Sequence, residues 1–348
     1  MKKRIIALGL AGAMAAVLLA GCGGASSKKS AASDGSAAAE TSGKTYKVAI
    51  VQTMDHASLD QIRKAVESEL DAKSKAEGIT IKYTEFNGQN DTSTLNTIGS
   101  DVVSDGYDCI IPIATLAAQC MQNAAEDSKT PIVFAAISDP VGAGLVQSLK
   151  KPGGNVTGTS DYLDASQLLD IIFEQNPKAK TIGLLYNKSE DASEVPIKEA
   201  KKYLDKKGVK YIEKTGTTSD EVSAAVDSMV DKVDAVFTPT DNTVAQAELA
   251  IADKFIKHKV PHYAGADSFV RNGAYATCGV DYTELGTKTA DMAVKVLKGQ
   301  DPAELPVSVM DGNIITVNTD TAKALGLDYS VFKSIKGKKV VTVKTSKE

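Results

Sequence analysis

Short apolar runs alternate with amphipathic stretches along most of the chain. In the first half the apolar runs fall at residues 48–51, 79–86, 109–113 and 131–137, and helical spacing fills the gaps at about 58–76, 92–104 and 115–127. Strands that alternate with helices in this way form parallel sheets with helices packed on their faces. The pattern therefore predicts an α/β fold.

The same order of elements begins again at residue 181. Apolar runs at 181–186, 209–213, 235–239 and 261–266 alternate with helical patterns at about 195–207, 220–232 and 243–258. Ala118-Gln119 returns as Ala245-Gln246, at an offset of 127 residues. A solenoid repeat is far shorter, at ~20–50 residues. We therefore expect two similar doubly wound parallel-sheet lobes joined by a hinge, with a ligand cleft between them, beyond the carboxyl ends of the strands.

The lobe boundaries follow from the repeat. We place lobe 1 at residues 46–158 plus about 284–305, and lobe 2 at 159–283 plus about 306–340. Gly153, Gly154 and Gly158 give the first crossing enough freedom to bend, although such glycines also occur in plain surface turns. The pattern does not decide which lobe contains the tail after about residue 305.

The N-terminus has the pattern of a bacterial lipoprotein signal. Basic residues 2–4 precede an apolar stretch that is short for a membrane span, which needs ~20 residues. The stretch ends in Leu19-Ala20-Gly21-Cys22, the box in which the cysteine is acylated and becomes the new N-terminus. A retained membrane anchor is the alternative. We expect a signal peptide at 1–21, lipidation of Cys22, and a flexible tether at 22–45 that is rich in Gly, Ala, Ser and Lys.

Composition and charge argue against several kinds of protein. Loss of the signal removes three of the 40 basic residues and leaves 37 against 44 acidic ones, a formal charge of −7, which lacks the basic footprint of a nucleic-acid binder. Cys109, Cys120 and Cys278 form neither a disulfide framework nor a metal-site spacing, so we expect all three cysteines to be buried and to pack as small apolar residues. Catalytic elbows and Walker loops are missing from the sequence, and Gly142-Ala-Gly144 is an incomplete dinucleotide fingerprint. We expect no enzyme, cofactor or metal.

Four stretches resemble one bacterial family. They are Ile111 to Gln119 (IPIATLAAQ), Pro131 to Gly144 (PIVFAAISDPVGAG), Lys151 to Gly158 (KPGGNVTG) and Pro239 to Thr243 (PTDNT). They look like the ABC-transporter substrate-binding lipoproteins of the tryptophan/tyrosine type, and the resemblance runs from Tyr46 to about Leu327. Leu116 and Cys120 depart from it, since relatives more often carry Pro and Ala there.

The resemblance implies a type I periplasmic-binding-protein fold. Its hinged lobes would capture a small molecule outside the cytoplasmic membrane, in the periplasm if there is an outer membrane, and present it to a membrane permease and its ATPase. Aromatic amino acids are the ligands most associated with close relatives, and we expect a monomer. The alternatives are a lipoprotein that reports its ligand to a membrane sensor, a binding protein for a nucleoside or sugar, and a tethered enzyme.

A zwitterionic ligand needs a donor-rich pole and an anionic pole. Thr115 follows a strand and opens a helix, so its hydroxyl and the next N–H groups suit a carboxylate, although most such threonines are plain N-caps. Asp241 or Asp267 would face the ammonium from the other lobe, unless Asp241 caps the helix that follows it. The candidate ligand-binding residues, all near strand ends or crossings, are Gln52, His56, Thr115, Leu116, Ser138, Asp139, Thr159, Ser160, Asn187, Thr240, Asp241, Asn242, Asp267 and Asp281.

Overall fold

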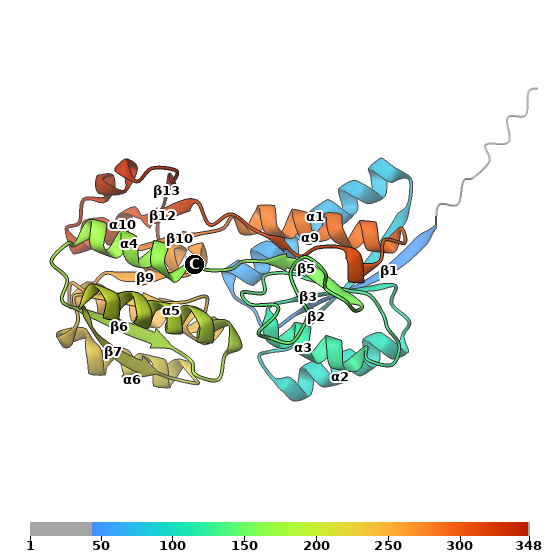
Figure 1. The fold of residues 1–348 in the computed structure, drawn as a ribbon, viewed down its shortest axis with the longest axis horizontal. Coiled ribbons are helices and arrows are strands. Elements are labelled where there is room, and N and C mark those ends of the chain that lie inside the picture. Colours follow the sequence, from blue (N-terminus) through green and yellow to red (C-terminus); the bar gives the residue numbers. More distant parts are fainter. Residues whose placement is uncertain (1–43, 347–348) are drawn as a thin grey trace, which may run out of the picture. The chain divides into compact units, whose positions relative to one another are not determined.

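The computed structural model describes residues 44–346, which form two β-sheets flanked by helices (Figure 1). The predicted signal peptide, the lipidation site Cys22 and nearly all of the predicted tether lie outside the described residues. The first strand begins at Thr45, at the last residue assigned to the tether. No helix within residues 44–346 is both long enough and apolar enough to cross a membrane.

Lobe 1 holds one of the two sheets, with strand order β11-β5-β4-β3-β1-β2 and parallel pairing between neighbours. Its strands are β1 (Thr45–Gln52), β2 (Thr80–Asn87), β3 (Cys109–Ile113), β4 (Ile132–Phe134), β5 (Val156–Ser160) and β11 (Ser308–Val309). Its helices are α1 (Ala57–Glu77), α2 (Thr92–Ser104), α3 (Thr115–Ala124) and α9 (Tyr282–Leu297), with the short 3-10 helix η2 (Pro302–Glu304).

Lobe 2 holds the other sheet, in the order β13-β12-β10-β9-β8-β6-β7, and only the β10–β12 pair in it is antiparallel among the described residues. The strands are β6 (Thr181–Tyr186), β7 (Lys210–Thr215), β8 (Ala235–Thr238), β9 (His262–Ala264), β10 (Ala276–Gly279), β12 (Ile314–Asn318) and β13 (Lys339–Val343). The helices are α4 (Ala165–Gln175), α5 (Asp191–Lys207), α6 (Ser219–Met229), α7 (Asn242–Lys257), α8 (Asp267–Arg271) and α10 (Thr319–Leu325), with 3-10 helices η1 (Val230–Lys232) and η3 (Tyr329–Ser334).

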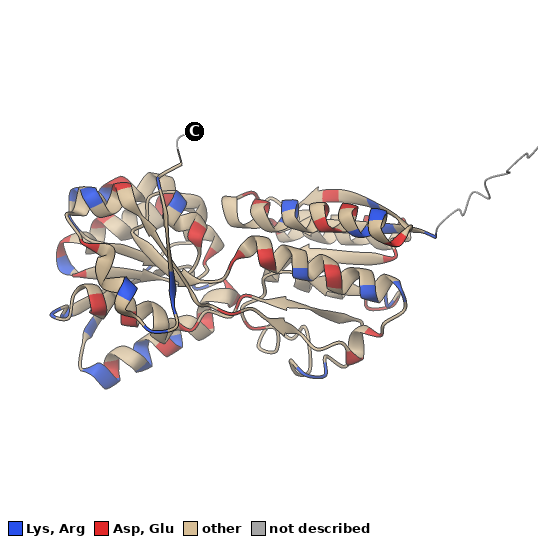
Figure 2. Ribbon diagram, turned by 90° about the horizontal axis from the view of Figure 1, so that it is seen from above, with Lys and Arg blue, Asp and Glu red and all other residues tan. Residues whose placement is uncertain are grey.

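Helices cover both faces of each sheet, which confirms the predicted doubly wound α/β fold. In β1, Val48 and Ile50 share a buried cluster with residues of α1 and α9, whereas Ala49 and Val51 share another with residues of α2 and α3. A central parallel strand that is buried on both faces has a continuous run of apolar residues. This is why the apolar run at residues 48–51 predicted β1. Lys/Arg and Asp/Glu are interspersed over the outer helices of both lobes (Figure 2).

The chain passes between the lobes at residues 161–164, 280–281 and 310–313. The sequence placed the first and third boundaries slightly earlier, after 158 and about 305. The strands continue past those points because Ser308 and Val309 pair with Thr159 and Ser160 at the edge of lobe 1. Gly158, predicted to ease the crossing, lies inside β5, where a Cβ would fall 2.1 Å from the carbonyl oxygen of Phe134. It allows close approach of two strands rather than bending.

The predicted roles of the three cysteines agree with the structure. Cys109, Cys120 and Cys278 are buried, each within a different apolar cluster, and the described part of the chain contains no disulfide between them. Burial raises the pKa of the Cys109 thiol to about 12, so this group stays protonated and inert.

Candidate functional site

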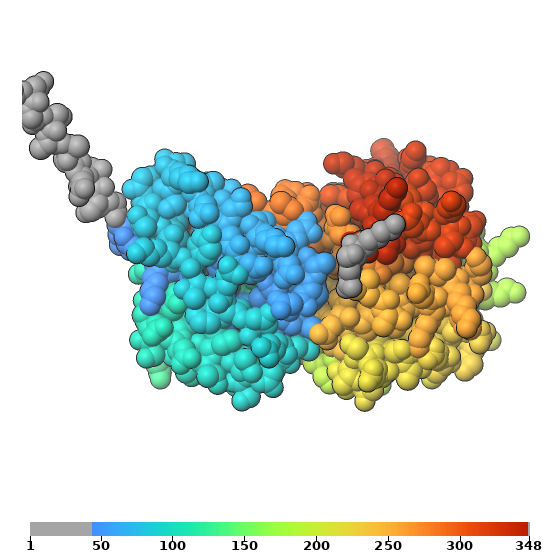
Figure 3. Space-filling view, turned by 180° about the vertical axis from the view of Figure 1, so that it is seen from behind, coloured from blue at the N-terminus to red at the C-terminus, as the bar shows by residue number. Residues whose placement is uncertain are grey.

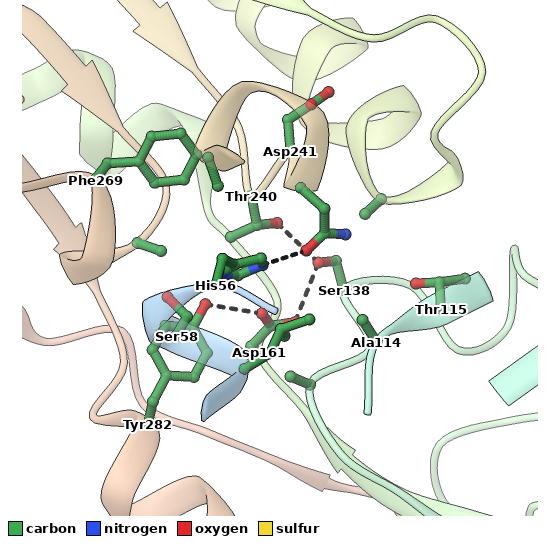
Figure 4. A pocket seen from close by; sticks show the side chains of 16 residues that line it. His56, Ser58, Ala114, Thr115, Ser138, Asp161, Thr240, Asp241, Phe269 and Tyr282 are labelled. Atoms are coloured by element: carbon green, nitrogen blue, oxygen red, sulfur yellow. Dashed lines mark hydrogen bonds between the residues drawn. The ribbon is translucent and has the colours of Figure 1, made fainter. Parts of the chain in front are cut away.

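A pocket lies between the two lobes, where strands of both sheets end (Figure 4). It is lined by His56, Ser58, Leu59, Ala114, Thr115, Ala136, Ser138, Asp161, Ala192, Thr240, Asp241, Asn242, Ala245, Ala266, Phe269 and Tyr282. Many of these residues directly follow a strand, as expected for the ligand side of an open parallel sheet. The free volume is about 30 Å³, which is room for one or two water molecules.

Direct hydrogen bonds between the lobes explain the small volume. His56 Nε2 lies 2.8 Å from Asn242 Oδ1, and the hydroxyls of Ser138 and Thr240 are 3.0 Å apart. The Ser58 hydroxyl donates to that of Ser268, at 2.5 Å, where residues of α1 in lobe 1 abut lobe 2 (Figure 3). A ligand the size of an amino acid can enter only if the lobes separate and these polar groups exchange partners.

Asp161, in the first crossing, is the buried acid of the pocket. Its side chain accepts hydrogen bonds from the hydroxyls of Ser138, at 3.1 Å, and Tyr282, at 3.0 Å. Burial raises the pKa of the Asp161 carboxyl, against these two bonds, which favour its charged form. No basic side chain within residues 44–346 compensates its charge. A buried carboxylate without a cationic partner is costly, so this position favours a ligand that brings a cation.

The N-terminus of α3 is the donor-rich part of the pocket. Its N-cap residue, Ala114, has φ of 72° and supplies no capping side chain, and within residues 44–346 only Thr53 covers this first turn, with its hydroxyl accepting from the N–H of Ala117. The N–H groups of Thr115 and Leu116 and the Thr115 hydroxyl therefore suit an anion. Ala114 and Ala136 both hold positive φ, 72° and 57°, and such strain in L residues concentrates at functional sites.

The corresponding helix of lobe 2, α7, is already capped by the protein. Asp241 accepts from the N–H of Val244 with one oxygen, and from the N–H of Asn187 and the hydroxyl of Ser193 with the other. Glu190 accepts from the N–H of Asn242 at 2.8 Å. In Figure 4 the Asp241 carboxylate points away from the centre of the pocket. The geometry thus corrects the prediction that Asp241 faces a ligand ammonium, because both of its oxygens are used in capping.

The other predicted acids also lie apart from the pocket centre. Asp267 pairs with Arg271, with Nε and Oδ2 3.1 Å apart, and Asp281 caps α9 by accepting from the N–H groups of Thr283 and Glu284. Asp139 accepts from the N–H of Gly142 in a turn, as its residue type commonly does. None of the three lines the pocket.

The remaining predictions divide between pocket and framework. His56, Thr115, Ser138, Thr240 and Asn242 line the pocket. Leu116 and Asn187 line an adjoining space of about 300 Å³ between the lobes. Gln52, Thr159 and Ser160 instead form hydrogen bonds within the protein. The Gln52 amide donates to the carbonyl oxygen of Met54 and to Asp60, and the hydroxyls of Thr159 and Thr289 bond each other. The Ser160 hydroxyl accepts from the N–H of Tyr162.

Sequence reasoning missed Asp161, Tyr282 and Phe269. Asp161 directly follows two predicted site residues, so its position at a crossing was a usable signal. The sequence contains no such signal for Phe269, which is an ordinary apolar position, or for Tyr282, which is an ordinary helix start. Within residues 44–346 no group of His, Cys, Asp or Glu is arranged to hold a metal ion.

Comparison with known proteins identifies the family. The sequence model for "ABC transporter substrate binding protein" matches residues 47–340. The chain is 38% identical over 330 residues to a tyrosine-binding protein of Clostridioides difficile (strain R20291), and the alignment covers 93% of each chain. It is also similar to an ABC domain from Streptococcus pneumonia solved in complex with L-Trp, with 36% identity, a TM-score of 0.78, and coverage of 86% of this chain and 100% of that one.

A ligand-free, open structure of a substrate-binding protein with adhesive properties from Clostridium difficile has higher identity, 40%, at the same coverage. Its TM-score is nevertheless lower, at 0.67. Because the family match spans most of the chain and the two-lobe fold is shared, the chain belongs to the ABC transporter substrate-binding protein family.

Proposed function

We propose that this protein is the lipid-anchored solute-binding protein of an ABC importer, and that it captures an aromatic amino acid, namely tryptophan, tyrosine or phenylalanine. The observation that carries the proposal is the pairing of two poles in one pocket. Within residues 44–346 Asp161 is a buried acid without a cationic partner, and the first turn of α3 has two N–H groups, those of Thr115 and Leu116, that no side chain caps. An α-amino acid supplies the missing ammonium and carboxylate together.

The rest of the pocket suits an aromatic side chain. Leu59 and Phe269 provide larger apolar surfaces, and alanines at 114, 136, 192, 245 and 266 leave space once the lobes part. Aromatic rings gain most from burial against such surfaces. The names of the relatives, one a tyrosine-binding protein and one a complex with L-Trp, support the same class of ligand.

A nucleoside or sugar fits this pocket less well, because a neutral ligand leaves Asp161 buried and without a cation. Reporting to a membrane sensor uses the same binding step as import, so the pocket does not separate these two roles. We favour import because the family is that of transporter binding proteins.

Binding is tested directly by titration calorimetry with tyrosine, tryptophan, phenylalanine, glucose and adenosine. The chain contains no tryptophan, so the emission of added L-tryptophan should also shift to the blue as its indole enters the pocket. We expect binding of aromatic amino acids at one equivalent, and much weaker binding of tyramine and of 3-(4-hydroxyphenyl)propionate, each of which lacks one charged group. Binding of a sugar or nucleoside with no response to amino acids would reject the assignment.

We also propose how the protein works in the cell. Acylation of Cys22 would hold the body outside the cytoplasmic membrane, and the loaded monomer would deliver its ligand to the permease, whose ATPase drives import. Cys22→Ala should move the protein from the membrane fraction to the soluble fraction with unchanged thermal stability. Equal membrane retention of this variant would argue against the lipid anchor.

A further inference from the structure

The side-chain amide of Asn242 has a fixed orientation in the pocket. Glu190 Oε1 accepts a hydrogen bond from the backbone N–H of Asn242, at 2.8 Å, so this oxygen acts as an acceptor. The side-chain Nδ2 of Asn242 lies against the same oxygen and donates to it. Asn242 Oδ1 consequently faces the other lobe, where it lies 2.8 Å from His56 Nε2.

This orientation fixes the tautomer of His56. Because an amide oxygen only accepts, Nε2 must carry a hydrogen. Burial lowers the pKa of the His56 ring and outweighs the bond to Asn242 and the nearby carboxylates of Asp60 and Asp55, so the ring is neutral. A neutral ring with its hydrogen on Nε2 has a lone pair on Nδ1. That atom is buried, and no group within residues 44–346 donates to it.

The ring of His56 lies within the pocket, between Thr240 and Tyr282 in Figure 4, and Phe269 and Leu59 line the same space. The pocket therefore contains an enclosed acceptor near the apolar surfaces that suit an aromatic ring. A buried acceptor is costly to leave without a donor. The ligand ammonium is not the best donor for it, because Asp161 offers that group a full opposite charge.

We propose that His56 is a specificity-determining residue that accepts a hydrogen bond from the ring of the ligand, so that the protein selects aromatic amino acids with a ring donor. The phenol O–H of tyrosine and the indole N–H of tryptophan supply that donor, and phenylalanine does not. This inference rests on the proposed function, since it assumes an aromatic amino acid in the pocket. A site built around a hydrogen bond discriminates against analogues that lack it more strongly than an apolar pocket does.

The test is the ratio of dissociation constants for phenylalanine and tyrosine, measured by calorimetry in three proteins. In the wild type we expect phenylalanine to bind at least about 10-fold more weakly than tyrosine. His56→Gln keeps an amide donor near the position of Nε2 for Asn242 and has no acceptor at the position of Nδ1, since its remaining acceptor, Oε1, lies elsewhere on the amide; the ratio should fall to about 1–2. Gln119→Ala is the control, because it disturbs a contact between the lobes outside the pocket: it removes the bond of Gln119 to Asp191, together with its bond to the carbonyl oxygen of Ala143. Its ratio should match the wild type.

A ligand series on the wild type keeps the inference testable even if His56→Gln folds poorly, as its thermal midpoint would reveal. 4-Fluorophenylalanine resembles tyrosine in size and lacks the donor, so it should bind like phenylalanine; tight binding of this analogue would overturn the inference. An unchanged ratio in well-folded His56→Gln would also overturn it, while leaving the amino-acid assignment standing. Failure of the wild type to bind any aromatic amino acid would overturn the proposed function and this inference together.

Discussion

At the scale of single residues, Asp161 has opposite effects on folding and on binding. Burial raises the pKa of its carboxyl in the folded protein, so its contribution to stability is fully present below the ordinary Asp range, about pH 4, and is lost as the pH rises through the folded-state value. Above that pH the ligand-free protein bears the cost of a buried charge. The same charge is what attracts the ammonium of the ligand.

The first prediction follows from this sign. Asp161→Asn should raise the thermal midpoint of the ligand-free protein at neutral pH, and this gain should disappear on acidification. The variant should also bind tyrosine about 10–100-fold more weakly, since a charge-assisted bond is lost. In the wild type, tyrosine affinity should decline as the pH falls and Asp161 is protonated. In Asp161→Asn this decline should be much smaller. Scanning calorimetry and titration calorimetry across a pH series measure both effects.

Asp281→Asn is the matched control, because this exposed residue caps α9 and lies outside the pocket. It should lower the midpoint slightly and leave tyrosine affinity unchanged. If Asp161→Asn instead destabilises the protein at every pH and binds tyrosine normally, Asp161 is a structural acid and the ammonium pole lies elsewhere.

Sequence reasoning at this scale identified positions better than roles. Thr115 follows a strand and begins a helix, and that local rule brought it to the pocket. Asp241 satisfies the same rule and acts as a cap, because Asn187 and Ser193 donate to its second oxygen from segments distant in sequence. A local pattern cannot distinguish an acid that caps a helix from one that meets a ligand when distant donors decide between them.

At the scale of elements, the contact between α1 and α9 joins segments that are far apart in the sequence. Gly286 of α9 makes this contact close, since a Cβ there would lie 2.6 Å from the carbonyl oxygen of Ile62 and 2.7 Å from Ala65 Cβ. Backbone atoms cannot yield as a flexible side chain can. Small residues at such crossings thus set the distance between helices.

The second prediction is that Gly286→Ala destabilises the protein by about 1–3 kcal/mol, because overpacking outweighs the roughly 1 kcal/mol that alanine gains in helix propensity. Gly154→Ala is the control, since no atom lies within 4 Å of its added Cβ. Urea unfolding of both variants measures the difference. A neutral or stabilising Gly286→Ala would show that the two helices can move apart at little cost.

The elements that the sequence predicted are those with periodic signals. The strands and helices of both repeats, from β1 to β4 and from β6 to β9, lie close to their predicted positions. β11 has only two residues and β12 runs antiparallel to β10, so neither continues the repeat. Which lobe the C-terminal tail joins depends on strand pairing between residues far apart in the sequence. The periodicity of apolar residues does not encode such pairing.

At the scale of the whole described body, the hydrogen bonds between lobes compete with the ligand. The pocket has about 30 Å³ of free volume, so an aromatic amino acid can bind only from an arrangement in which the lobes have separated. Binding then depends on the population of that arrangement, and the ligand favours closure through contacts with both lobes.

The third prediction tests this requirement by joining the lobes. The hydroxyl oxygens of Ser58 in α1 and Ser268 in α8 are 2.5 Å apart, which is close to the S–S distance of a disulfide, about 2.05 Å. The double variant Ser58→Cys with Ser268→Cys should therefore crosslink on oxidation and hold the cleft shut. Stopped-flow measurements should show tyrosine associating at least about 10-fold more slowly with the oxidised than with the reduced form, because the open population is removed. Ser58→Cys alone should show no such dependence on redox state. Oxidised and reduced double variants with equal association rates, once crosslinking is verified by mass, would mean that the ligand enters without separation of α1 from α8, and the hinge motion would have to be assigned to another part of the interface.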